Sequence, residues 1–386
     1  MASNPFHYGT PVEGDQFAGR ELELEALVSR MRNRVHIVLL SPRRYGKTSL
    51  LLRAEAQLAT ADPPPAIVKA NVLRARDLPT LVAQLTAGAY RIPGARWHRA
   101  RQAVPEFLRR LRLRPTVAFD DDGKPTFSFA ADIAGPDAEQ VIADLYGLLD
   151  EEAGRRPAVL ILDEFQAITS HGSHLPGLLK ALADAHPRVT LVVAGSKRHL
   201  MERLVTSEGA PLYGMAQKLA LGPIPDDVMG AFLERRARGA GRPFTAGTAG
   251  RVLDLAGPVP NDIQHLAYEA FEVAGRRIDD EAVTRGLALA VAHEASSYAE
   301  VFAARPPGQR RVLVALAVGS PHPAYSAGFA RSVGLAGSNS VKKAVDALAA
   351  DELVAERDGR LTVADPFFAA WLRPAASLEP DIGAGR

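Results

Sequence analysis

The sequence predicts an α/β fold in which helices cover both faces of a mostly parallel β-sheet. Through the first half of the chain, short apolar runs alternate with helical patterns, which is the rhythm of a parallel sheet. After the Gly-Pro-Ile-Pro run at residues 222–225, only helical periodicity continues. Near the end, two extended segments flank Asp358-Gly359, a typical hairpin turn. Together these observations predict a sheet-containing core followed by two smaller C-terminal domains.

The predicted core comprises residues 1–222. Its strands correspond to apolar runs at residues 35–40, 66–70, 158–162, 189–194 and 218–221. Continuous rather than alternating apolar character indicates strands that are buried on both faces, as in a parallel sheet. An insertion of about residues 91–135 separates the second of these strands from the third.

A small helical domain is predicted over residues 223–304. Helical periodicity is found at residues 226–240, 246–256, 261–274 and 279–293. Because the apolar positions recur at helical spacing and no further strand pattern intervenes, these helices must pack against one another.

The last predicted domain, over residues 305–374, has the element order of a winged helix-turn-helix. It opens with a loop at residues 305–308 and two short helices. A turn at 334–338, a longer helix at 339–350 and the hairpin at 353–363 then follow. Residues 375–386 are rich in Ala, Gly and Pro, so we expect them to form a flexible tail.

Composition excludes several classes of protein. The 386 residues include 46 Lys plus Arg and 44 Asp plus Glu, so the formal charge of +2 indicates no partner by itself. No cysteine is present, which excludes disulfides, thiolate metal sites and a cysteine nucleophile. The N-terminus lacks the pattern of a secretory signal, and no apolar run approaches the roughly 20 residues that span a bilayer. We therefore expect a cytoplasmic protein without a membrane partner.

The run at residues 35–52 has the order of a phosphate-binding loop: a buried strand, a tight loop and a helix start. A triphosphate needs inward-pointing backbone N–H groups, a glycine where a side chain would collide with phosphate, a lysine and a magnesium-binding hydroxyl. Gly46, Lys47 and Thr48 supply the last three. The alternative is an ordinary strand-turn-helix with an exposed lysine. The predicted nucleotide-binding residues of the loop are Ser41, Pro42, Arg43, Arg44, Tyr45, Gly46, Lys47, Thr48 and Ser49.

Two carboxylates follow the apolar run 158–162. Asp163 is predicted to bind Mg²⁺ together with Thr48, directly or through water. Glu164 is predicted to orient and deprotonate the attacking water, which distinguishes a hydrolase from a nucleotide binder. The alternative for an Asp-Glu pair at this position is a helix N-cap with its first-turn acid.

Another apolar run, at residues 189–194, ends in small and polar residues. Ser196 is predicted to hydrogen-bond either the γ-phosphate or the attacking water, although a simple turn serine is the alternative. Arginines nearby could stabilise charge in the transition state. The candidates are Arg43, Arg44, Arg198 and Arg203, among which the sequence does not choose.

These motifs together resemble the archaeal-type ATPase family of the AAA+/STAND branch of P-loop NTPases, over most of the chain. The resemblance includes Phe-Ala-Gly-Arg-Glu-Leu-Glu-Leu at residues 17–24, the loop at 41–50 and Leu-Asp-Glu-Phe-Gln at 162–166. Ala-Gly-Ser at 194–196 with Met201, Gly-Pro-Val-Pro at 257–260 and Asp-Pro-Phe-Phe-Ala-Ala-Trp-Leu at 365–372 complete it. Two positions depart from the family pattern: Ser41 replaces the first glycine of the phosphate loop, and Pro258 replaces a glycine of the lid.

The resemblance implies an AAA+-type core with a five-stranded parallel sheet, a helical lid and a C-terminal winged helix. It places Phe17, Gly19 and Arg20 beside the adenine, and it brings the Pro260 region of the lid close to the base. It also implies that ATP or ADP is bound with Mg²⁺.

The stretch from Arg91 to Arg114 contains many arginines and a single acid, Glu106. With the interleaved Trp97 and His98 it could contact a nucleic-acid backbone. Alternatively, its leucines pack and its arginines form a solvated face. The following residues, 115–130, are predicted to form a hairpin.

The winged helix leaves the same two alternatives open. Its predicted recognition helix begins near Ser338 and carries Lys342 and Lys343, which suits a DNA major groove. Acidic residues at 346, 351 and 352 dilute this charge, and winged helices in related proteins often contact protein.

We favour an ATP-hydrolysing switch, in which hydrolysis repositions the winged helix relative to the core. A nucleotide-stabilised interaction scaffold with little turnover is the second hypothesis, and a DNA-associated ATPase is the third. Nucleotide-dependent homo-oligomers are compatible with all three. A small-molecule kinase is disfavoured, because the acid after Asp163 suits attack by water.

Overall fold

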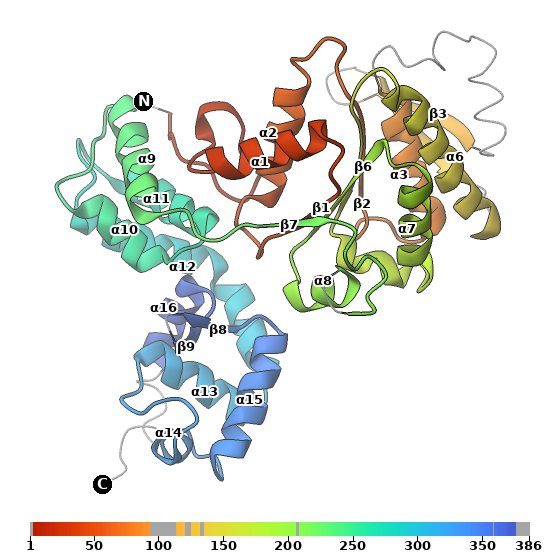
Figure 1. Ribbon diagram of the computed structural model, residues 1–386. Helices are drawn as coiled ribbons and strands as arrows, with labels where there is room; N and C mark the ends of the chain where they lie inside the picture. Colours follow the sequence, from red (N-terminus) through yellow and green to blue (C-terminus); the bar gives the residue numbers. More distant parts are fainter. Residues whose placement is uncertain are drawn as a thin grey trace. The chain divides into compact units, whose positions relative to one another are not determined.

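The computed structural model describes residues 3–92, 113–119, 125–131, 135–205, 208–357 and 359–375 (Figure 1). The chain forms two compact units. The first comprises Pro11–Ile224, and the second joins the N-terminal residues up to Thr10 to the residues from Pro225 onward. Residues 1–10 were predicted to belong to the core, and this prediction is wrong. Phe6 is fully buried against the rings of Phe244 and Phe271, so its apolar surface attaches this segment to the second unit.

The first unit contains the predicted five-stranded parallel sheet, with strand order β2-β5-β6-β1-β7. Each strand coincides with an apolar run of the sequence. The strands are β1 (Ile37–Leu40), β2 (Ala66–Asn71), β5 (Ala158–Asp163), β6 (Val189–Gly195) and β7 (Gln217–Ala220). Because all five are parallel, their carboxyl ends lie at one edge of the sheet, where ligands of such sheets bind.

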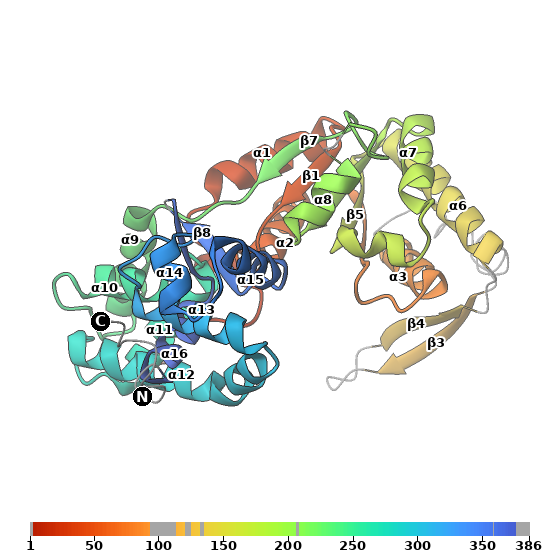
Figure 2. The ribbon, with the colours of Figure 1, turned by 90° about the horizontal axis from the view of Figure 1, so that it is seen from below.

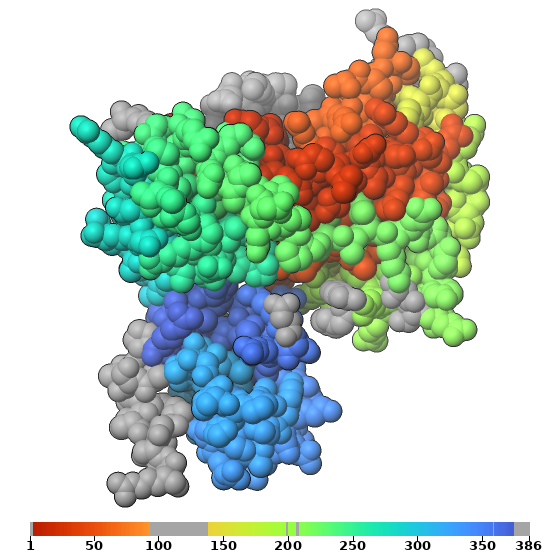
Figure 3. Space-filling view, turned by 60° about the vertical axis from the view of Figure 1, so that its left-hand side comes forward, coloured from red at the N-terminus to blue at the C-terminus, as the bar shows by residue number. Residues whose placement is uncertain are grey.

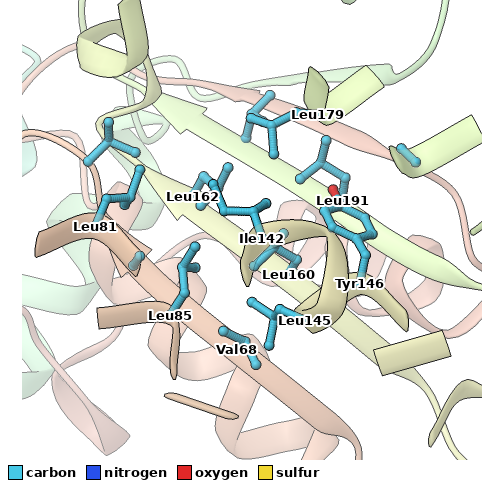
Figure 4. Close-up of a cluster of buried hydrophobic side chains, with 14 of the residues drawn as sticks. Val68, Leu81, Leu85, Ile142, Leu145, Tyr146, Leu160, Leu162, Leu179 and Leu191 are labelled. Carbon is cyan, nitrogen blue, oxygen red and sulfur yellow. The ribbon is translucent and has the colours of Figure 1, made fainter. Parts of the chain in front are cut away.

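Helices cover both faces of this sheet. Alternate residues of β5 enter two separate hydrophobic clusters: Val159 and Ile161 join one, whereas Leu160 and Leu162 join the other. The first cluster is closed by α1 (Glu21–Arg32) and α2 (Lys47–Leu58). The second, drawn in Figure 4, is closed by α3 (Leu78–Tyr90), α6 (Gly135–Ala153), α7 (Leu175–Ala185) and α8 (Arg198–Val205). Burial on both faces explains why the three central strands, β1, β5 and β6, are largely apolar, whereas the edge strand β7 is mostly exposed.

The predicted hairpin in the insertion is confirmed. It consists of β3 (Leu113–Phe119) and β4 (Pro125–Ala131), which pair antiparallel beside α3 (Figure 2). Most of the arginine-rich stretch, residues 93–112, lies outside the described residues. Two short 3₁₀ helices, η1 (Gly14–Gln16) and η2 (Phe165–Ser170), complete the first unit.

The second unit begins with four helices. They are α9 (Asp226–Gly239), α10 (Thr248–Ala256), α11 (Pro260–Val273) and α12 (Asp280–Ala303). The predicted end of the last helix, at residue 293, is wrong, because α12 continues to Ala303. No glycine or proline interrupts residues 294–303, and the buried Tyr298 of this extension packs against Phe368 and Trp371.

The winged helix-turn-helix follows α12. Its elements are α13 (Pro307–Val318), α14 (Ala327–Ser332), α15 (Ser338–Ala350), β8 (Val354–Arg357), β9 (Arg360–Val363) and α16 (Pro366–Ala375). The predicted loop at 305–308 is shorter than expected, because Pro307 starts α13, a position where proline fits well. In Figure 3 the blue surface of these elements continues the green-to-cyan surface of α9–α12. The predicted tail lies outside the described residues from 376 onward.

Across the described residues, none of the helices combines the length and the apolar character that a membrane-spanning helix requires.

Candidate functional site

The loop between β1 and α2 lies at the carboxyl edge of the sheet. Arg44 and Gly46 have left-handed backbones, with φ of 67° and 87°. A Cβ added to Gly46 would meet no protein atom within 4 Å, so within the chain itself the glycine is required by its φ. Ser41 has no positive φ, and its N–H donates to the carbonyl of Gly195 at 3.2 Å. Serine is therefore compatible with the position where the family pattern has glycine.

The side chains of Lys47, Asp163 and Glu164 converge. Lys47 starts α2, and its Nζ lies 2.8 Å from Asp163 Oδ1 and 2.6 Å from Glu164 Oε1. Only 7% of the lysine side chain is exposed. The topology causes this meeting, because β1 leads directly into α2 and β5 ends at Asp163 on the same edge of the sheet. A buried cation held by two carboxylates forms a compact polar site there.

Glu164 is held on several sides. Its Oε2 accepts hydrogen bonds from Ser196 Oγ at 2.8 Å and from Gln166 Nε2 at 2.5 Å. Its backbone N–H donates to Asp163 Oδ1 at 2.9 Å, and its φ of 54° is unusual for a residue with a side chain. Burial alone would raise the pKa of Glu164, but Lys47, Gln166 and Ser196 outweigh it, so the pKa lies below its ordinary value. The carboxylate is therefore ionised at neutral pH.

Gln166 belongs to the site, although no role was predicted for it from the sequence. It is 8% exposed, and its Oε1 is buried without a hydrogen-bond partner. The motif at residues 162–166 includes this glutamine, but its role becomes visible only when β6 brings Ser196 to the same carboxylate. A Cβ on Gly195 would lie 2.6 Å from Gln166 Oε1 and 2.5 Å from Met201 Sδ, which explains the glycine before Ser196.

Arg20 reaches the back of the phosphate loop. Its guanidinium donates to the carbonyls of Gly222 at 2.5 Å and Tyr45 at 3.4 Å, and it pairs with Glu23 at 2.8 Å. The arginine is 3% exposed. It therefore ties the loop to the last residues of the first unit.

The other residues predicted around the nucleotide occupy several environments. Phe17 packs against the cluster that contains α1 and α2, and Gly19 has a φ of 63°. The hydroxyl of Ser49 accepts a hydrogen bond from the N–H of Val12 at 3.0 Å. Thr48 is half-buried at the second position of α2, and Tyr45 is half-buried. Pro42, Arg43 and Arg44 are exposed.

Three predicted residues are not brought to this site by the described geometry. Arg198 starts α8, but its side chain lies outside the described residues. Arg203 is exposed on the same helix. Pro260 begins α11 in the second unit, and its approach to a base stays a prediction.

The donor set fits magnesium. The hydroxyl of Thr48 and the carboxylate of Asp163 are hard oxygen ligands, which Mg²⁺ prefers and usually supplements with water and phosphate oxygens. The Lys47 ammonium and the backbone N–H groups at the start of α2 suit phosphate. Glu164, which can act as a base, contacts both the phosphate-binding Lys47 and the metal-binding Asp163. The arrangement can thus hold a metal-bound phosphate chain next to a carboxylate able to accept a proton.

Comparisons with known proteins agree with this architecture. Residues 296–374 match a family described as "Probable winged helix domain". The Walker-type ATPase of Pyrococcus abyssi superposes with a TM-score of 0.64 at 18% identity, covering 96% of this chain and 99% of that one. The ORC2 protein of Aeropyrum pernix, in its ADPNP-ADP complexes, superposes with a TM-score of 0.59 at 15% identity and 98% coverage of both chains. No curated protein sequence matches the chain. The chain therefore shares the fold of these two proteins.

Proposed function

We propose that the chain binds ATP with Mg²⁺ at the site formed by Lys47, Asp163 and Glu164, and that it hydrolyses the γ-phosphate bond. The observation that carries the proposal is the meeting of the Lys47 amine with the two carboxylates at the start of α2. Two further findings support it. One structural neighbour is a Walker-type ATPase, and another was solved with ADPNP and ADP.

In the proposed binding step, backbone N–H groups of the loop and the Lys47 ammonium both contact the phosphates of ATP. The residues from Arg43 to Gly46 would present backbone N–H groups to the phosphates, and the positive end of α2 attracts their charge. Lys47 neutralises the β- and γ-phosphate oxygens. Thr48 and Asp163 would hold Mg²⁺, which supplies charge neutralisation on the phosphate oxygens.

The chemical step depends on Glu164. Its ionised carboxylate accepts a proton from water, which then forms a bond to the γ-phosphorus while the bond to the β-phosphate oxygen breaks. Ser196 and Gln166 both donate to Glu164 Oε2 and fix the direction of the carboxylate. A small-molecule acceptor is disfavoured because a carboxylate base directly after Asp163 suits attack by water.

We further propose that hydrolysis acts as a switch on the unit that contains the winged helix. Arg20 offers a physical link, because it donates to Tyr45 in the phosphate loop and to Gly222, two residues before Ile224 ends the first unit. Because the Arg20 guanidinium donates to both carbonyls, a shift of the phosphate loop at Tyr45 would also displace the backbone at Gly222. Nucleotide can bias such an equilibrium only by contacting one state better than the other.

Replacement of Lys47 tests the proposal. We expect Lys47→Ala to abolish both ATP binding, measured by calorimetry, and phosphate release. Lys69→Ala is the matched control, since Lys69 is a partly buried lysine of this unit that, like Lys47, pairs with a glutamate, in this case Glu55 at 2.8 Å. The control should keep normal turnover. ATP binding and phosphate release at wild-type levels in Lys47→Ala would refute the proposal.

A further inference from the structure

Three side chains of the kinds that bind transition metals meet in the second unit. His265 and Glu269 lie four residues apart on α11, and His293 lies on α12, which runs beside it (Figure 1). Their ligand atoms all lie within 4.8 Å of one another, and no other His, Cys, Asp or Glu group of this kind occurs among the residues that the structure describes. None of the three takes part in the proposed ATP site.

The distances suit a tetrahedral metal. Glu269 Oε1 lies 3.6 Å from His265 Nε2 and 3.4 Å from His293 Nδ1. Ligands at the usual Zn–N and Zn–O bond lengths are about 3.4 Å apart in a tetrahedron. The two distances from Glu269 therefore already match the spacing in a tetrahedral site, and the ligand atoms of the two histidines lie within 4.8 Å of each other.

Neighbouring aromatic side chains hold two of the three candidate ligands, His265 and Glu269, in place. The Tyr8 hydroxyl donates to Glu269 Oε1 at 3.3 Å, and the Tyr8 ring stacks on the His265 ring at 3.9 Å. The ring of Phe367 in α16 contacts His265 edge-on at 5.2 Å. A hydrogen bond of the kind that Tyr8 makes orients a ligand and raises metal affinity, and the two ring contacts restrict rotation of His265. His265 and Glu269 are buried, whereas His293 is 57% exposed and leaves an entry path for the ion.

We propose that His265, Glu269 and His293 form a binding site for a divalent transition metal of the Zn²⁺ type, with water at a fourth position. Two imidazoles and one carboxylate are typical ligands of Zn²⁺, whereas Mg²⁺ and Ca²⁺ need mainly oxygen ligands. Bound metal would join α11 to α12 and stabilise the contacts of Tyr8 and Phe367 with His265.

The site is tested by treating the full-length, untagged chain with EDTA, removing the EDTA and titrating the protein with Zn²⁺. We expect one Zn²⁺ per chain by calorimetry and elemental analysis, together with a higher melting temperature, since metal that binds only the folded state stabilises it. His293→Ala should weaken binding about 100-fold, and Tyr8→Phe, which keeps the ring, about 10-fold. His322→Ala, an exposed histidine in the winged helix, is the control and should change nothing.

Two further variants complete the design. Asp163→Asn should keep the zinc site, which separates it from the carboxylates of the proposed ATP site. Glu269→Gln keeps the shape of the side chain and should lose zinc, while His293 is exposed enough for its alanine variant to fold normally. Failure to bind Zn²⁺, or equal affinity in wild type and His293→Ala, would overturn the proposal.

Discussion

Glu164 depends on its neighbours for both its charge and its direction. Burial favours the neutral acid, yet Lys47, Gln166 and Ser196 together keep the pKa of Glu164 below its ordinary value. A general base must be ionised to accept a proton, so the rate of hydrolysis should fall only when acid protonates this carboxylate. At neutral pH the proposed base is therefore fully available.

Gln166 is predicted to be a positioning residue for this base. Gln166→Ala removes a hydrogen bond that favours the ionised form of Glu164, so the pKa of Glu164 should rise. The acid limb of the pH profile of kcat should then shift to higher pH. We expect kcat at neutral pH to fall about 10- to 100-fold, the usual effect of removing a residue that orients a functional side chain, with little change in KM for ATP.

Gln140→Ala is the matched control for this substitution. Gln140 also donates to a carboxylate, that of Asp144 on the surface of α6, at 2.9 Å. Its removal should change neither kcat nor the pH profile. A Gln166→Ala variant with normal kcat and an unshifted acid limb would exclude the positioning role.

At the scale of elements, α11 and α12 approach each other closely at Gly286. A Cβ there would lie 2.6 Å from the backbone N of Ala270, which is closer than real Cβ contacts. Gly286 lies seven residues before His293, two turns along the same face of α12. The glycine thus sets the separation of the two helices that carry the proposed metal ligands.

We predict that Gly286→Ala lowers the free energy of unfolding by about 1–3 kcal/mol, the usual cost of overpacking. Gly250→Ala, in α10, is the control, because its added Cβ meets no atom within 4 Å. That variant should be more stable by about 0.5–1 kcal/mol, owing to helix propensity. Urea denaturation, followed by Trp371 fluorescence in a Trp97→Phe background, measures both. Equal effects of the two substitutions would contradict the close approach.

Local patterns were sufficient to predict the strands and most helices. Continuous apolar runs located all five strands of the sheet, and Asp358-Gly359 located the wing hairpin, where Gly359 has a φ of 72°. The end of α12 was missed because its last turns have mixed polarity and are fixed by long-range packing of Tyr298 on Phe368. Contacts between distant segments leave no periodic signal in either segment.

For the whole molecule, contacts between distant segments also explain why the division into two units was predicted incorrectly at the N-terminus. The attachment of the N-terminal residues to the second unit depends on Phe6 meeting Phe244 and Phe271, far away in the chain. The meeting of Lys47 with Asp163 and Glu164 was predictable, because β1 and β5 are parallel and parallel strands have their carboxyl ends at one edge of a sheet. The contribution of Gln166 was not, since it depends on side-chain directions around Ser196.

The most direct test of the proposed function is to measure ATP binding and phosphate release together for wild type and Glu164→Gln. Glutamine keeps the shape of the side chain but cannot serve as the base. With saturating ATP and Mg²⁺ we predict steady phosphate release by wild type and a rate about 10²- to 10⁴-fold lower for the variant, with ATP affinity nearly unchanged. Equal rates for the two proteins, or no phosphate release by wild type, would contradict hydrolysis at the site of Lys47, Asp163 and Glu164.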